Sequence, residues 1–207
     1  MIPIFYKTSL VAGFLSALVL LPVSAFAQPA SSTLDSKINK ARTSTPSFFD
    51  FSGTDIRGKK VHFSQYRGKV VLVVNTASEC GFTPQLKDLE EIFKKYSTKG
   101  FTVLAFPSDD FHQEKGSAEQ VLKFAQKEYG ITFPIFDKGP VTGDAKQPVY
   151  KFMTEQKPGM LFKDVRWNFE KFLINRQGKV VERWSSMTSP TSKSVIEKIE
   201  KALVDPI

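Results

Sequence analysis

The sequence predicts one α/β domain in which helices cover both faces of a central mixed β-sheet. The first observation is a nearly unbroken run of valine and leucine at residues 69–74, typical of a central strand buried on both faces. The second is that segments with apolar residues at helical spacing alternate with short apolar or β-branched runs, in the order β-β-β-α-β-α-β-α-β-β-α. With 207 residues, 41% of them hydrophobic, the chain is long enough for one substantial core.

The first 27 residues are predicted to be a secretory signal peptide. Lys7 precedes an apolar stretch over residues 9–23, and Ala25-Phe26-Ala27 has the small-x-small pattern of a cleavage site. An uncleaved membrane anchor is the alternative, but the stretch of about fifteen residues is shorter than the roughly 20 that a spanning helix needs. We therefore expect a periplasmic protein without stable membrane insertion. Residues 28–46, rich in Ser, Thr, Ala and Pro, are expected to be a flexible lead-in to a domain over 47–207.

The charge balance excludes some function classes. The formal net charge is +8, which would suit nucleic acid, but the lysines alternate with acids, as in residues 90–95, and form no basic stripe. No nucleic-acid partner is therefore expected. Two histidines and one cysteine in the whole chain give no metal-ligand spacing, so neither a metal nor a bound cofactor is expected.

The elements follow from local patterns along the chain. Apolar residues at helical spacing from Leu86 to Tyr96 predict a helix that Gly100 can end. Ser117 and Gln120 form a possible capping box for a helix through residue 129. Ser189-Pro190 is a good cap and first-turn pair for a closing helix. The other expected elements are strands within 48–53 and 59–66, a strand at 101–108, a short strand at 133–136, a short helix at 149–155 and a hairpin at 171–184.

Cys80 is the only cysteine in the chain. Exported proteins usually pair their cysteines in disulfides, so an unpaired one is a candidate reactive thiol. Cys80 lies after the predicted central strand and before a predicted helix, where ligand sites of α/β sheets collect. The helix N-terminus favours a thiolate, the form that attacks peroxides to give a sulfenic acid. The alternative is a buried, inert cysteine.

Four segments, in order, resemble the glutathione peroxidase family in its cysteine form. They are "NTASECGFTPQLKDLEEIFKKY" (75–96), "LAFPSDDFHQE" (104–114), "YGITFPIF" (129–136) and "RWNFEKFLINRQGKVVERW" (166–184). The resemblance covers roughly residues 47–203. It implies a thioredoxin-like fold and reduction of hydrogen peroxide or of organic and lipid hydroperoxides.

The resemblance also implies a set of site residues. The peroxidatic residue falls on Cys80, and its polar partners fall on Gln113, Trp167 and Asn168. The side-chain amides and the indole N–H are neutral donors that can stabilise a thiolate and orient a peroxide. Taken singly, each of the three partners also fits a structural role.

Three further residues near this set are not assigned to it. Thr83 and Pro84 are predicted to be the cap and first-turn residue of the helix after Cys80. Lys171 either adds positive potential to the site or is an exposed strand residue.

The sequence departs from the family pattern in three places. The resolving cysteine of many relatives falls on Ala125 and a third cysteine on Ser108, so a sulfenic acid on Cys80 needs an external thiol, either glutathione or a dithiol protein. Asp109 and Asp110 replace Asn-Gln and would raise the pKa of a nearby thiol, unless they point to solvent. The short segment between 158 and 167 suggests a monomer.

The sequence thus predicts an exported, single-cysteine, thiol-dependent peroxidase. A redox sensor or partner-binding module with little turnover is the alternative, motivated by the missing resolving cysteine and the altered Asp109-Asp110 loop. An inert scaffold with a buried Cys80 is a third possibility.

Overall fold

The computed structural model describes residues 46–206. The signal peptide expected over residues 1–27 and the lead-in expected over 28–46, apart from its last residue, lie outside this range. Within 46–206, no helix combines the length and apolar character needed to cross a membrane.

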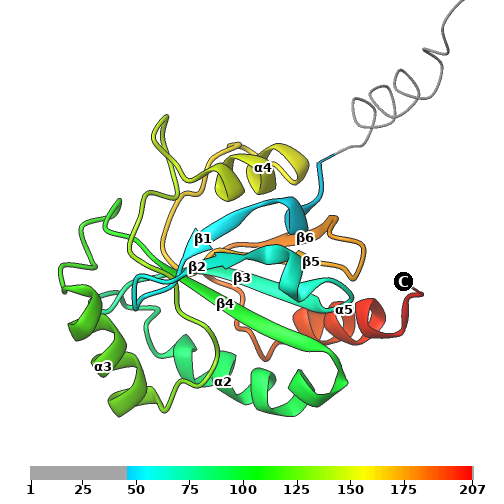
Figure 1. Ribbon diagram of the computed structural model, residues 1–207, viewed down its shortest axis with the longest axis horizontal. Coiled ribbons are helices and arrows are strands. Elements are labelled where there is room, and N and C mark those ends of the chain that lie inside the picture. Colours follow the sequence, from blue (N-terminus) through cyan, green and yellow to red (C-terminus); the bar gives the residue numbers. More distant parts are fainter. Residues whose placement is uncertain (1–45, 207) are drawn as a thin grey trace, which may run out of the picture. The chain divides into compact units, whose positions relative to one another are not determined.

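Strands and helices occur in the predicted order, except that no regular strand forms between the second and third α-helices (Figure 1). The strands are β1 (Ser52–Thr54), β2 (Lys60–His62), β3 (Val70–Thr76), β4 (Phe101–Pro107), β5 (Lys171–Ile174) and β6 (Val180–Trp184). The α-helices are α2 (Gln85–Tyr96), α3 (Ala118–Tyr129), α4 (Pro148–Gln156) and α5 (Lys193–Val204). Three short 3₁₀ helices are η1 (Phe48–Asp50), η2 (Phe63–Tyr66) and η3 (Ser97–Lys99).

The central sheet is mixed, as predicted. Its strand order is β4-β3-β5-β6, with β3 parallel to β4 and antiparallel to β5, while β1 and β2 form a separate hairpin. The short strand expected at 133–136 is reduced to two isolated bridges, Ala105 with Ile135 and Asp55 with Phe136. Pro134 directly precedes the two bridged residues of this segment and has no N–H to donate, which keeps the segment from forming a regular ladder.

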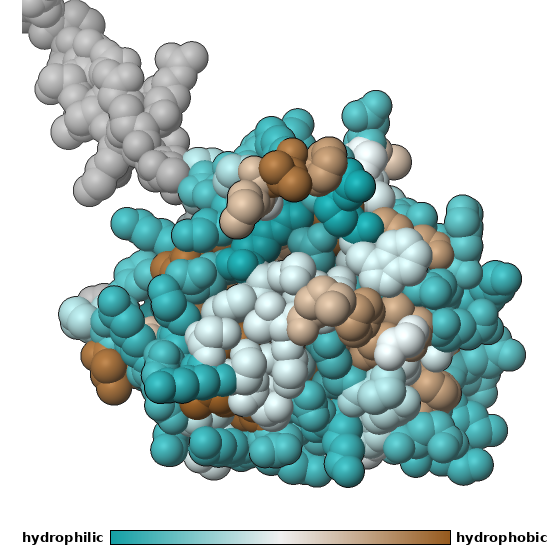
Figure 2. Space-filling view, turned by 180° about the vertical axis from the view of Figure 1, so that it is seen from behind, coloured by the Kyte–Doolittle hydropathy of each residue, from teal (hydrophilic) through white to brown (hydrophobic). Residues whose placement is uncertain are grey.

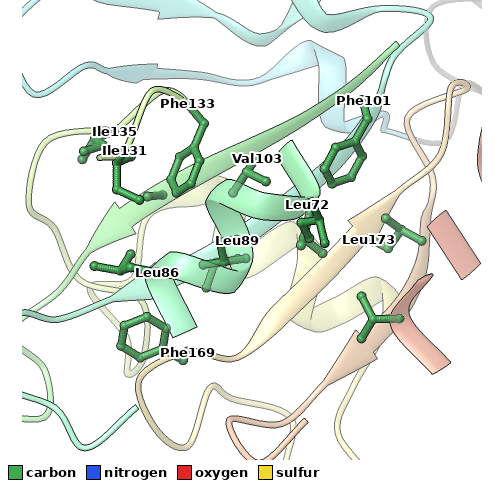
Figure 3. Close-up of a cluster of buried hydrophobic side chains, with 14 of the residues drawn as sticks. Leu72, Leu86, Leu89, Phe101, Val103, Ile131, Phe133, Ile135, Phe169 and Leu173 are labelled. Atoms are coloured by element: carbon green, nitrogen blue, oxygen red, sulfur yellow. The ribbon is translucent and has the colours of Figure 1, made fainter. Parts of the chain in front are cut away.

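The continuous apolar run of β3 serves two cores, one on each face of the sheet. Val70, Leu72 and Val74 face a cluster that includes residues of α2, α3 and α5, whereas Val71 and Val73 face a cluster that includes residues of η1, η2 and α4. Figure 1 shows α2 and α5 on one side of the sheet and α4 on the other. In Figure 3 the first cluster is seen where helix α2 lies over the sheet. A strand buried on both faces needs no polar alternation, which explains the pattern of the sequence.

The helix starts agree with the sequence in one case and differ in another. Ser117 N–H donates to Gln120 Oε1 (2.7 Å) and Gln120 N–H donates to Ser117 Oγ (3.3 Å), which confirms the capping box of α3. Helix α5, in contrast, begins after Ser192, three residues later than predicted from Ser189-Pro190. The Ser189 hydroxyl instead accepts from Thr191 N–H and donates to Asp88 of α2, so it closes a turn before the helix.

The turn between β5 and β6 gives a test of this architecture. Gly178 has a φ of 82°, and a Cβ there would overlap Ser47 Oγ and approach Phe49 Cδ2 to 2.8 Å. Gly58 has nearly the same φ, 83°, but no atom within 4 Å of such a Cβ. We expect Gly58→Ala to lower the free energy of unfolding by about 1 kcal/mol. Gly178→Ala should cost about 1–3 kcal/mol more, because Ser47 and Phe49 must also move.

Denaturant unfolding followed by circular dichroism measures both variants against the wild type. Equal losses for the two would contradict the close packing of η1 on the β5–β6 turn.

Candidate active site

Cys80 lies in a tight turn between β3 and α2. Its N–H donates to Thr83 Oγ1 (3.1 Å), and that hydroxyl donates in turn to the carbonyl of Ala77 (2.8 Å). Thr83 was predicted to cap α2, but α2 begins at Gln85 with Pro84 at the cap position and no capping side chain. The Thr83 hydroxyl is used instead to close the turn around Cys80, so its role is to hold the cysteine in place.

The sulfur of Cys80 is largely buried and receives one backbone donor. The residue is 6% exposed, and Phe82 N–H points to Sγ at 3.4 Å. Such a donor is a favourable partner for negative charge that develops on sulfur during a reaction. Sequence reasoning missed Phe82, since a backbone N–H becomes a site group only through the shape of the turn.

Gln113 and Asn168 lie together beside this turn. Asn168 Nδ2 donates to Gln113 Oε1 (2.9 Å), and the carbonyl of Gln113 accepts from Glu79 N–H (3.0 Å), the residue before Cys80. Asn168 is fully buried. The structure thus brings three of the four predicted site residues into one connected group, although they are far apart in the sequence.

Trp167 lies at the edge of this group. It is 42% exposed and packs against Phe111, with ring centroids 5.3 Å apart. Within residues 46–206 the Phe82 N–H is the only hydrogen-bond donor to the sulfur, so Gln113, Trp167 and Asn168 do not themselves donate to it in this structure. Their roles as activating donors stay predictions.

Asn75, at the end of β3, holds the segment that carries Trp167 and Asn168. Its side-chain amide donates to Trp167 O (3.0 Å) and accepts from Glu170 N–H (3.0 Å), and its backbone carbonyl accepts from Phe169 N–H. Phe169 has a φ of 66°, a conformation uncommon for a large side chain. The feature of the sequence that could have indicated this role is the position of Asn75, an amide residue that directly follows five aliphatic residues.

Asp109 and Asp110 are structural rather than directed at the sulfur. Asp109 Oδ1 accepts from Glu114 N–H (3.1 Å), and Asp110 Oδ2 accepts from the N–H groups of Val141 (2.7 Å) and Thr142 (2.9 Å). These carboxylates therefore order the loop that carries Gln113. The solvent-directed arrangement considered from the sequence is not what the structure has.

A second carboxyl ties the same loop to the Cys80 turn. Ser78 Oγ donates to Glu114 Oε1 (2.8 Å), and Glu114 is 1% exposed. Burial raises the pKa of Glu114, and the hydrogen bond from Ser78 opposes that shift. The residues that flank Cys80 and Gln113 are thus joined by a side-chain bond as well as by backbone.

No second thiol is available to Cys80. Cys80 is free, and the positions of the family's additional cysteines are held by buried Ala125 and Ser108. Among residues 46–206, no group of three His, Cys, Asp or Glu side chains is placed to hold a metal ion.

Lys171, at the start of β5, is completely buried, so its interpretation as an exposed strand residue is wrong. Its ammonium donates to the carbonyls of Thr188 (2.6 Å) and Ser185 (3.4 Å). Burial lowers the pKa of Lys171 to about 7, against the opposing charges of Glu170 and Asp88.

The lowered pKa of Lys171 predicts that the free energy of unfolding depends on pH. The pKa of Lys171 is about 7 in the folded chain and 10.5 in the reference state, so between these pH values the unfolded chain binds one more proton. The free energy of unfolding should therefore rise with pH in that window. Relative to Lys171→Met, we expect the wild type to gain about 2 kcal/mol between pH 7 and pH 9.

Urea unfolding at the two pH values measures this difference, with Lys87→Met, at an exposed lysine on α2, as the control. A difference that does not change with pH would contradict the shifted pKa.

Comparisons with known proteins agree with the fold and with the site. The family model for glutathione peroxidase matches residues 48–154. Glutathione peroxidase-like peroxiredoxin HYR1 of Saccharomyces cerevisiae is 51% identical over 158 residues, which cover 75% of this chain and 96% of that protein. The crystal structure of Trgpx in apo form has 44% identity and a TM-score of 0.66, over 79% of this chain and 99% of that one.

A thioredoxin-family thiol:disulfide interchange protein from Chlorobium tepidum matches with a TM-score of 0.55 at 20% identity, over 74% of this chain and 92% of that one. At that identity the likeness concerns the fold alone, and it confirms the predicted thioredoxin-like architecture. The match to the family model and the identity to HYR1 over most of its length decide the assignment: the chain belongs to the glutathione peroxidase family.

Proposed function

We propose that this protein is a thiol-dependent peroxidase that reduces hydrogen peroxide and organic or lipid hydroperoxides through Cys80. The observation that carries the proposal is the environment of the chain's only sulfhydryl group. Cys80 sits in a turn fixed by Thr83, with the Phe82 N–H at its sulfur, next to the joined amides of Gln113 and Asn168. The family membership of the chain points to the same chemistry.

The first step is a two-electron oxidation of the sulfur. The Cys80 thiolate attacks one peroxide oxygen, the O–O bond breaks, and the departing oxygen takes a proton to leave as water or an alcohol. Cys80 becomes a sulfenic acid. The N–H of Phe82 lies where it can follow the charge on sulfur, and the amides of Gln113 and Asn168 are the neighbouring polar groups for the peroxide.

The second half of the cycle requires an external reductant. One thiol attacks the sulfenic sulfur, releasing water and forming a mixed disulfide, and a second thiol then releases reduced Cys80 and an oxidised disulfide. Both a small thiol such as glutathione and a protein dithiol satisfy this balance. The buried Ala125 and Ser108 at the alternative cysteine positions support the external route.

Apolar side chains at the rim of the site support organic hydroperoxides as substrates. Trp167 is partly exposed and packs at a tilt against Phe111. Phe162, which lines a surface pocket together with Phe111, is 50% exposed beneath the guanidinium of Arg166. Figure 2 shows that hydrophobic residues on the displayed face form small patches within a mostly hydrophilic surface. Such a rim offers contact to an alkyl chain without excluding hydrogen peroxide.

We expect sustained peroxide consumption by the wild type in the presence of excess thiol, and its loss in Cys80→Ser. The reason is that Cys80 is the only thiol in the chain. A steady-state assay with hydrogen peroxide and cumene hydroperoxide, each with glutathione or a dithiol protein, measures the turnover. Met160→Leu, at a sulfur-containing side chain that is 100% exposed and lies outside the site, controls for peroxide consumed by methionine.

A single stoichiometric oxidation of Cys80 without turnover, with every thiol tried, would instead support the redox sensor or partner-binding module. The missing resolving cysteine favours that second candidate. The Asp109-Asp110 loop no longer does, because both carboxylates are engaged by backbone amides.

We also propose that the protein is exported to the periplasm and acts as a monomer. The order of Lys7, the apolar stretch and Ala25-Phe26-Ala27 supports export. We expect the protein recovered from a periplasmic extract of expressing bacteria to begin at Gln28, as measured by N-terminal peptide mass spectrometry, and to sediment as a monomer. A chain that retains residues 1–27 in the membrane fraction would contradict the export proposal.

A further inference from the structure

Residues 185–189, between β6 and α5, form a turn that contacts both Asn168 and the start of α2, the helix that follows Cys80. Ser186 Oγ donates to the carbonyl of Asn168 (2.5 Å), and the carbonyl of Ser186 accepts from Gln85 Nε2 at the start of α2 (2.7 Å). Ser189 Oγ donates to Asp88 Oδ2 of the same helix (3.0 Å). The turn 185–189 thus connects the helix that follows Cys80 to the backbone of Asn168.

The buried ammonium of Lys171 lies beneath this turn. Its two hydrogen bonds go to the first and fourth residues of the turn, through the carbonyls of Ser185 and Thr188. The turn is closed internally by Thr188 N–H donating to Ser185 O (3.2 Å). Lys171 pairs with Val74 in the β3–β5 register, so it also belongs to the strand next to the one that leads to Cys80. One side chain therefore joins the sheet to the turn.

We propose that Lys171 is a positioning residue whose terminal amino group, through its two hydrogen bonds, holds the turn 185–189 in place and thereby fixes Asn168 relative to the Cys80 turn. This inference rests on the proposed function, in which Asn168 belongs to the site. Lys171 has no hydrogen bond to Cys80 or to Asn168, so it acts through Ser186 and the turn.

The ammonium form of Lys171 makes the stronger bonds to the turn, because charge-assisted hydrogen bonds are stronger than neutral ones. Burial lowers the pKa of Lys171 to about 7, so the variants below are compared at about pH 6, where the ammonium form predominates. The charged groups that act on it are Glu170, its neighbour in the chain, and Asp88, from α2. Asp88 also accepts from Ser189, so the same carboxylate faces the ammonium and holds the end of the turn. The amino group of Lys171 is thus buried at a point where three separate segments meet.

The test compares Lys171→Met, which keeps an unbranched side chain but removes the terminal donor and its charge, with Lys171→Arg, which keeps both. The first readout is the second-order rate constant for oxidation of Cys80 by hydrogen peroxide, measured by rapid quench and mass spectrometry. The second is amide hydrogen exchange in peptides that cover 167–170 and 185–189. Lys87→Met, at an exposed lysine on α2, is the matched control.

We expect Lys171→Met to lower the rate constant about tenfold or more and to speed exchange in both peptides, because the turn is released. Lys171→Arg should remain within about threefold of the wild type, since it retains a charged donor. Ser186→Ala, which removes the bond from the turn to Asn168, should slow oxidation as well. The double variant Lys171→Met with Ser186→Ala should be oxidised no more slowly than the slower of these two single variants, because both substitutions break the same connection to Asn168.

The proposal would be overturned if amide exchange in residues 185–189 were the same in Lys171→Met as in the wild type, whether or not oxidation of Cys80 were slower. Equal losses in Lys171→Met and Lys171→Arg would overturn the role of the charge. If the wild-type protein does not react with peroxide, the proposed function fails, and the exchange measurements alone decide whether Lys171 holds the turn.

Discussion

The candidate site depends above all on the buried side chain of Asn75. This amide uses its donor on Trp167 O and its acceptor on Glu170 N–H, while the backbone carbonyl of the same residue accepts from Phe169. Three bonds from one residue thus fix a segment nearly a hundred positions away. They also maintain Phe169 in a left-handed conformation that the chain would not otherwise favour. Because Asn75 is part of β3, the strand that leads to Cys80 also positions Asn168.

The loop that carries Gln113 is likewise held by hydrogen bonds to a segment that is distant in the sequence. Glu79 N–H binds the carbonyl of Gln113, and Ser78 binds the buried carboxyl of Glu114. The two residues before Cys80 therefore hold the loop of Gln113, whereas Thr83, three residues after it, closes the turn itself. The sulfur lies in a short segment whose neighbours on both sides are fixed, an arrangement that limits the movement required before reaction.

The sequence was informative where a pattern depends on neighbours in the chain. The double burial of β3 followed from its unbroken aliphatic run, and the capping box of α3 followed from the spacing of Ser117 and Gln120. It was uninformative where a polar group has a distant partner. Asp110 accepts from backbone 31 residues away, and Lys171 donates to carbonyls 14 and 17 residues away, so neither environment has a local signature. Thr83 shows the intermediate case: its type predicted a cap, but its hydroxyl closes the turn before the helix.

The two halves of the proposed cycle place different demands on the same sulfur. With only 6% of Cys80 exposed, a small hydroperoxide needs less room to reach the sulfur than a larger reductant does. An external thiol must reach the same atom, because Ala125 leaves no thiol on α3 to reach it from within. The hydrogen bonds from Cys80 N–H to Thr83 and from Thr83 to Ala77 hold the turn around the sulfur closed. In the proposed cycle, the size of the external thiol therefore affects the second step, in which it must reach the sulfur of Cys80.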